Sequence, residues 1–223
     1  MTPILEMRGV RKSFGGVVAN RDVTLSVPEG KTYGLIGPNG SGKTTLFSCI
    51  AGSHPIDKGS IRFQGREISA LRVPKIARLG LLRTFQQTRV YVKMTCMQNM
   101  LISAPDAAPG WSSFFRKSSP AEERNADELL ELAMALMSEP RMLLLDEPTA
   151  GINPKLIDDL LDRLRRVNRE RGITLFVIEH NMRVIMGLAD YIYCLAHGEL
   201  LAQGKPEEIQ TDQRVIDAYL GAQ

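Results

Sequence analysis

The stretch Gly37-Pro38-Asn39-Gly40-Ser41-Gly42-Lys43-Thr44-Thr45 fits the phosphate-binding pattern GxxxxGK[ST] without a mismatch. An apolar run, residues 33–36, precedes it, and a helix-like stretch, residues 44–51, follows it. Glycines at 37, 40 and 42 allow the backbone to curl without a Cβ penalty, so that consecutive N–H groups point inward around an oxyanion. The sequence therefore predicts a phosphate-binding loop between a strand and a helix.

The helix that begins near Lys43 adds the partial positive charge of its N-terminus to this loop. Lys43 is placed to reach the β- and γ-phosphates of a nucleotide, and the Thr44 hydroxyl is placed to bind Mg²⁺. A glycine-rich loop that matches by chance is the alternative. The strand before the motif and the helix after it argue against chance.

Composition predicts a globular chain with a core of its own. Of its 223 residues 43% are hydrophobic and 24% are charged, and the net charge is only +3. This balance indicates neither a nucleic-acid footprint nor a disordered tail. Arginines at 163, 165, 166, 169 and 171 alternate with acidic residues on an expected helix, which favours a solvated helix face over a DNA-binding patch.

Cysteine spacing and hydropathy indicate a cytosolic protein. Cys49, Cys96 and Cys194 show no CxxC spacing, and Cys49 and Cys194 lie in apolar segments, so we expect neither disulfides nor structural zinc. The N-terminus has no basic region followed by an apolar one, and no run approaches the roughly 18 apolar residues that span a bilayer. We expect any contact with a membrane to be made through a partner.

The pattern along the chain predicts an α/β fold. Short β-like runs at residues 4–7, 23–27 and 32–36 suggest an antiparallel flap that leads into the phosphate loop. After residue 140, strands at 142–147, 173–178 and 190–195 alternate with helices at 154–170 and 181–188. Such alternation is typical of a mostly parallel sheet covered by helices.

Two adjacent carboxylates, Asp146 and Glu147, follow the apolar strand that starts at residue 142. At a strand end they are as well explained by capping of the next turn as by function. With a phosphate loop upstream, Asp146 becomes the expected carboxylate on the metal side, and Glu147 the residue that polarises the attacking water.

His180 follows another buried strand, at the edge where ligands sit in open α/β sheets. A lone histidine is usually structural, but this position favours contact with the γ-phosphate. His54 and His197 have no such placement, and we expect both at the surface or in turns. Gln86 ends a further extended segment and is either a plain polar terminus or a ligand for the metal.

In this order the motifs resemble those of the nucleotide-binding subunit of an ABC transporter, over nearly the whole chain. The resemblance implies a P-loop NTPase core, with residues 37–45 as its Walker A loop and Phe14 stacked on the adenine of ATP. It also implies that Gln86 is the Q-loop glutamine, that Asp146 is the Walker B aspartate, and that Glu147 is the catalytic glutamate. Residues 150–153 match the D-loop, and His180 matches the switch histidine.

Three stretches, residues 83–86, 178–182 and 215–221, look most like branched-chain amino acid importers, and lipopolysaccharide-export ATPases come second. The resemblance implies one domain over 1–223, with a nucleotide-binding core and β subdomain at 1–86 and 141–223 and a helical subdomain at 87–140. It implies ATP and Mg²⁺ as cofactors, and as partners a second ATP-binding subunit, transmembrane permease subunits and, indirectly, a periplasmic or extracellular solute-binding protein. It places this subunit in the cytoplasm, at the inner face of the cell membrane. Nucleic acid is not an expected partner.

The family's LSGGQ-like signature does not occur between Gln86 and Asp146. Residues 127–131 resemble the helix before the signature and residues 132–136 the tail of the helix after it, so the join looks like an excision. Either the protein lacks the segment or the sequence omits it. We expect omission, because the tail helix would otherwise lose its start and its cap. A true deletion favours a non-catalytic nucleotide-binding module.

Overall fold

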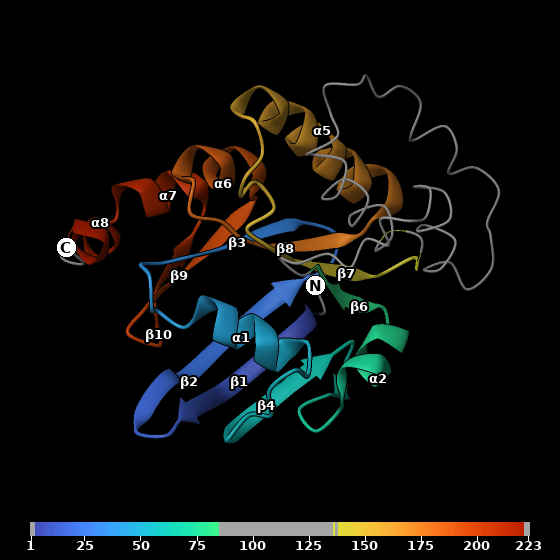
Figure 1. Ribbon diagram of the computed structural model, residues 1–223, viewed down its shortest axis with the longest axis vertical. Coiled ribbons are helices and arrows are strands. Elements are labelled where there is room, and N and C mark those ends of the chain that lie inside the picture. Colours follow the sequence, from blue (N-terminus) through green and yellow to red (C-terminus); the bar gives the residue numbers. More distant parts are fainter. Residues whose placement is uncertain (1–2, 85–135, 137, 221–223) are drawn as a thin grey trace.

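Two β-sheets pack against one helix between them in the computed structural model, which describes residues 3–84, 136 and 138–220 (Figure 1). That helix is α1 (Lys43–Ile50), the element predicted to follow the phosphate loop. Its side chains Leu46, Phe47 and Ile50 are fully buried and belong to the core cluster that both sheets share.

The first sheet is antiparallel, as predicted, with the strand order β2-β1-β4-β5. The expected run at 4–7 lies near the start of one longer strand and the run at 23–27 near the end of another, and these strands pair as far as Phe14 opposite Val17. The third expected run, 32–36, belongs to the second sheet instead. Left-handed residues Gln64 and Gly65 make the turn between its last two strands. Its strands are β1 (Pro3–Phe14), β2 (Val17–Pro28), β4 (Lys58–Phe63) and β5 (Arg66–Glu67).

The second sheet has six strands in the order β10-β9-β3-β8-β7-β6 and is parallel except for the β9–β10 pair. The mostly parallel α/β fold predicted from the alternation of elements is therefore confirmed. Its strands are β3 (Thr32–Ile36), β6 (Leu81–Arg83), β7 (Met142–Asp146), β8 (Thr174–Ile178), β9 (Tyr191–Ala196) and β10 (Glu199–Gly204).

Helices α5 and α6 cover the face of the six-stranded sheet that is turned away from α1 (Figure 1). The charged face of α5 carries exposed ion pairs, such as Arg166 with Glu170 at 2.8 Å, so the predicted solvated face is confirmed. Besides α1, the described helices are α2 (Val73–Arg78), α5 (Pro154–Arg171), α6 (Met182–Leu188), α7 (Pro206–Thr211) and α8 (Gln213–Leu220).

The central strands are buried on both faces, which explains their continuous apolar runs. In β8, Phe176 and Ile178 point into the cluster with α1, whereas Leu175 and Val177 point into the cluster with α5 and α6. Cys49 and Cys194 are buried, as predicted. Most of the expected helical subdomain, residues 87–135 and 137, lies outside the described residues, as do Cys96 and the join near residue 131.

Candidate functional site

The candidate residues follow neighbouring strands of the six-stranded sheet. Gly37 follows β3, Asp146 ends β7, and His180 lies two residues after β8. Because these three strands are adjacent and parallel, their carboxyl ends meet at one edge of the sheet (Figure 1). That edge is where open α/β sheets bind ligands.

The three glycines of the loop all have positive φ, at 145° for Gly37, 77° for Gly40 and 96° for Gly42. Packing adds a second constraint at two of them. A Cβ on Gly37 would lie 2.0 Å from the carbonyl oxygen of Leu195, and a Cβ on Gly42 would lie 2.2 Å from that of Ala19. A side chain at either position would therefore force the loop away from the strands behind it.

Gly42 is the N-cap of α1, and no side chain caps this end of the helix within the part of the chain that the structure describes. The first N–H groups of a helix have no partner inside the helix. The end of α1 therefore offers backbone donors and a partial positive charge to an anion in the loop. Thr44, in the first turn, is exposed.

Lys43 lies inside the loop and is 5% exposed. Its ammonium donates to the carbonyl oxygens of Gly37 at 2.7 Å and Pro38 at 3.0 Å. Burial lowers the pKa of Lys43, and negative charge on Glu147 and Asp146 opposes this shift. The side chain thus places a positive charge between the loop and the two carboxylates.

Asp146 is held by an arginine that the sequence reasoning did not assign a role. The Asp146 side chain is 3% exposed, and its Oδ2 accepts a 2.6 Å hydrogen bond from Arg83, which also donates to the Ser48 hydroxyl at 2.8 Å. The other carboxylate oxygen, Oδ1, is buried with no hydrogen-bond partner among the described residues. The sequence did contain a signal for this pair: Arg83 is a charged residue in a mostly apolar extended segment, three positions before Gln86.

Glu147 and His180 meet across the two strand ends. The Oε1 atom of Glu147 lies 2.8 Å from Nε2 of His180, with the side chains 25% and 40% exposed. Glu147 has a φ of 53°, a left-handed conformation that is uncommon for a residue with a side chain. The tertiary structure thus brings together two residues that the sequence analysis singled out separately.

Phe14 lies at the end of β1 and is 45% exposed, so the structure does not support a core position. Its ring makes an edge contact with His54, with centroids 5.3 Å apart, and the Lys12 ammonium lies 5.2 Å from its centre. His54 and His197 are exposed, as predicted. Gln86 lies outside the described residues.

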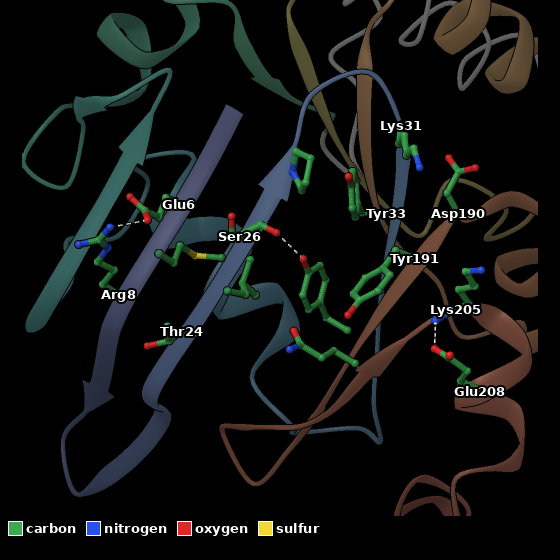
Figure 2. Close-up of a pocket in the computed structure, with 15 residues that line it drawn as sticks. Glu6, Arg8, Thr24, Ser26, Lys31, Tyr33, Asp190, Tyr191, Lys205 and Glu208 are labelled. Carbon is green, nitrogen blue, oxygen red and sulfur yellow. Dashed lines mark hydrogen bonds and ion pairs between the residues drawn. The ribbon is translucent and has the colours of Figure 1, made fainter. Parts of the chain in front are cut away.

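A second cavity, of about 750 Å³, lies at the opposite edge of the same sheet, where β3 and β9 begin (Figure 2). Tyr33, Tyr191 and Asp190 face it from these strands. Three acidic and three basic side chains line it, so its charges balance: Glu6, Asp190, Glu208, Arg8, Lys31 and Lys205. Its position separates this cavity from the phosphate loop.

Comparison with known proteins identifies the family of this chain. The sequence model of the ABC transporter family matches residues 20–150, which include the loop, Asp146 and Glu147. The chain belongs to the ABC transporter family. A second model, described as the branched-chain amino acid ATP-binding cassette transporter, matches residues 199–223 of this ABC ATPase, so it is of the branched-chain amino acid type.

Curated relatives match almost the full length of the ABC ATPase. It is 37% identical to the high-affinity branched-chain amino acid transport ATP-binding protein BraF of Pseudomonas aeruginosa, over 98% of both chains. It is 34% identical to LivG of Escherichia coli K12, again over 98% of both chains. The alignment with BraF runs over 250 positions against 223 residues here, so at least 27 of them have no counterpart in this chain.

Solved structures support the fold. The ATP-binding cassette MJ1267 of an ABC transporter in its ADP conformation superposes with a TM-score of 0.84 and 29% identity, covering 99% of this chain and all of that one. A nucleotide-free ATP-binding cassette superposes with a TM-score of 0.82. Within the described residues, no helix is both long and apolar enough to cross a membrane.

Proposed function

We propose that this ABC ATPase binds and hydrolyses ATP as the energy-coupling subunit of an importer for branched-chain or related amino acids. The observation that carries the hydrolytic step is the 2.8 Å contact between Glu147 and His180 beside the loop that contains Lys43. The relatives named for branched-chain amino acid transport support the choice of solute.

In this proposal different residues of the chain bind the nucleotide and activate the attacking water. Within the loop at 37–45, the backbone N–H groups at the start of α1 and the Lys43 ammonium hold the phosphates, and Phe14 stacks on the adenine. Glu147 orients the attacking water and takes up its proton. His180 fixes the Glu147 carboxylate and donates to the γ-phosphate.

The residues present also fit a Mg²⁺ ion that binds with the nucleotide. Asp146 offers a buried carboxylate oxygen with no donor among the described residues, and the exposed Thr44 hydroxyl stands at the start of α1. Oxygen ligands of this kind suit Mg²⁺, which would offset the charge of the phosphates. We propose Thr44, Asp146 and Gln86 as the groups on the metal side.

We further propose that the protein works as one domain over 1–223, paired with a second ATP-binding subunit and docked on transmembrane permease subunits at the inner face of the membrane. A cassette of this fold has been solved as a dimer bound to ADP and Pi, at a TM-score of 0.75. A periplasmic or extracellular solute-binding protein would deliver the amino acid to the permease.

The test is ATP hydrolysis by the purified chain, compared with Glu147→Gln and Lys43→Ala. Glu147→Gln keeps the shape of the side chain and removes the charge that orients water, so ATP binding should persist while turnover falls by about 10² or more. Lys43→Ala removes a charge-assisted bond to the phosphates and should weaken ATP binding itself.

Glu170→Gln on the exposed face of α5 is the matched control and should leave both quantities unchanged. Parent-like turnover by Glu147→Gln would assign water activation to another group. A parent chain that binds ATP without hydrolysing it would favour the second candidate, a non-catalytic nucleotide-binding module. The positions missing from this chain relative to BraF are the observation that favours that candidate.

A further inference from the structure

We infer that Glu179 is a positioning residue that ties the loop after β7 to the loop after β8 and so holds Glu147 and His180 in register. Glu179 directly precedes His180 and is 3% exposed. The inference deepens the proposed function, because it concerns the geometry of the same hydrolytic pair.

The Glu179 carboxylate accepts hydrogen bonds from four donors in two loops. Its Oε1 atom accepts from the Thr149 hydroxyl and from the Thr149 N–H, the latter at 3.1 Å. Its Oε2 atom accepts from the N–H groups of His180 at 2.8 Å and Asn181 at 3.2 Å. One carboxylate therefore joins segments 30 residues apart in the sequence.

These donors flank the two residues that meet at the site. Thr149 lies two positions after Glu147, and His180 is itself a donor to Glu179. The Glu147 N–H also donates to the carbonyl oxygen of Ile178 at 2.9 Å, so the loops touch on both sides of the Glu147–His180 contact. A shift of either loop would change the 2.8 Å separation between Oε1 of Glu147 and Nε2 of His180.

A carboxylate suits the four donors around Glu179. It is a pure acceptor with two oxygens and about four lone-pair sites, and hydrogen bonds from four donors compensate its burial. Glutamine has the same shape, but its NH₂ group would face two of the donors. Glu179→Gln should therefore push one loop away while the phosphate loop, which connects β3 to α1, stays in place.

The first experiment measures ATP affinity and turnover separately for Glu179→Gln, with Glu170→Gln as the control. We expect turnover to fall by about 10- to 100-fold, the effect of misplacing a reacting group by roughly 1 Å, with the ATP dissociation constant within about twofold of the parent value. Loss of affinity in parallel with turnover, or parent-like turnover, would overturn the inference.

Thr149 supplies a second pair of variants that keeps the test independent of how well Glu179→Gln folds. Thr149→Val removes one of the four donors and should lower turnover by about 3- to 10-fold, and Thr149→Ser should recover most of that loss. In Glu179→Gln/Thr149→Val the two losses should not multiply, because both changes break the same bond. Multiplicative losses would contradict the shared role.

A spectroscopic measurement separates failure of this inference from failure of the proposed function. The chain has three histidines, so the ring ¹⁵N signals of His180 can be assigned by substituting His54 and His197. Glu147→Gln and Glu179→Gln should both move these signals, because both disturb the contact with Glu147. Unmoved His180 signals in a folded Glu179→Gln protein would overturn the inference, even for a parent chain without ATPase activity.

Discussion

At the scale of single residues, the adjacent carboxylates of Asp146 and Glu147 have different surroundings. Asp146 is buried against Arg83, and its Oδ1 atom has no hydrogen-bond partner within the described part of the chain. Glu147 is more exposed and touches a histidine, a group able to share a proton with it. In the proposed function, these different environments would suit Asp146 to hold a metal ion and Glu147 to exchange a proton.

Phe14→Ala tests the proposed adenine contact at this scale. Loss of a base stacked on an aromatic ring should weaken ATP binding by about 1 to 3 kcal/mol, while the phosphates remain held. The melting temperature should stay near that of the parent, because the ring is 45% exposed. Val17→Ala, an exposed partner of Phe14 across the hairpin, is the control and should leave affinity unchanged. Undiminished affinity in Phe14→Ala would remove Phe14 from the binding site.

At the scale of elements, the C-terminal helix α8 braces the phosphate loop. The hydroxyl of Tyr219 accepts a 2.8 Å hydrogen bond from the N–H of Gly37, the first residue of the loop. Burial raises the pKa of Tyr219 to about 12. Because α8 falls within the region matched by the branched-chain amino acid transporter model, this brace belongs to the part of the chain that marks the subfamily.

Tyr219→Phe should lower the free energy of unfolding by about 1 to 3 kcal/mol, because it leaves the buried N–H of Gly37 without its acceptor. Urea unfolding monitored by circular dichroism measures this change. Tyr191→Phe removes a tyrosine hydroxyl at the other edge of the sheet, by the second cavity, and should cost less than about 0.5 kcal/mol. Equal costs for the two variants would show that the bond to Gly37 contributes nothing specific.

At the scale of the whole molecule, stability is tied to groups that are buried in their neutral form. Burial raises the pKa of Cys49 and of Cys194 from 9.0 to about 11, and that of Tyr33 from 10.0 to about 12. Each group has a folded-state pKa above its unfolded value. The stability it contributes is therefore complete below the unfolded pKa and is lost as the pH rises through the folded pKa.

The free energy of unfolding should accordingly stay level up to about pH 9 and fall between pH 9 and 12. Each group that ionises only in the unfolded state should add a slope of about 1.4 kcal/mol per pH unit. Denaturant titrations at pH 8, 9, 10 and 11 measure the curve. Tyr33→Phe removes one such group and should flatten the fall above pH 10, so a variant curve parallel to the parent curve would contradict this account.

The sequence by itself determined the elements that depend on neighbouring residues. The loop at 37–45 was readable because glycine spacing, a preceding strand and a following helix all lie within about 20 residues. The buried strands β7 and β8 were readable as apolar runs with polar residues after them. The sequence analysis did not predict α7 and α8, although Pro206 at the start of α7 and Glu207 and Glu208 in its first turn are usual signals of a helix start.

Only the tertiary structure decided which side chains meet. The contact of His180 with Glu147 spans 33 residues, that of Arg83 with Asp146 spans 63, and that of Tyr219 with Gly37 spans 182. The first two contacts depend on which strands are neighbours in the sheet and on their register, and the third depends on where α8 packs. Strand order and helix packing arise from the whole chain rather than from any local pattern. A sequence shows that a glutamate follows a buried strand, but the four donors around Glu179 exist only after two distant loops have been brought together.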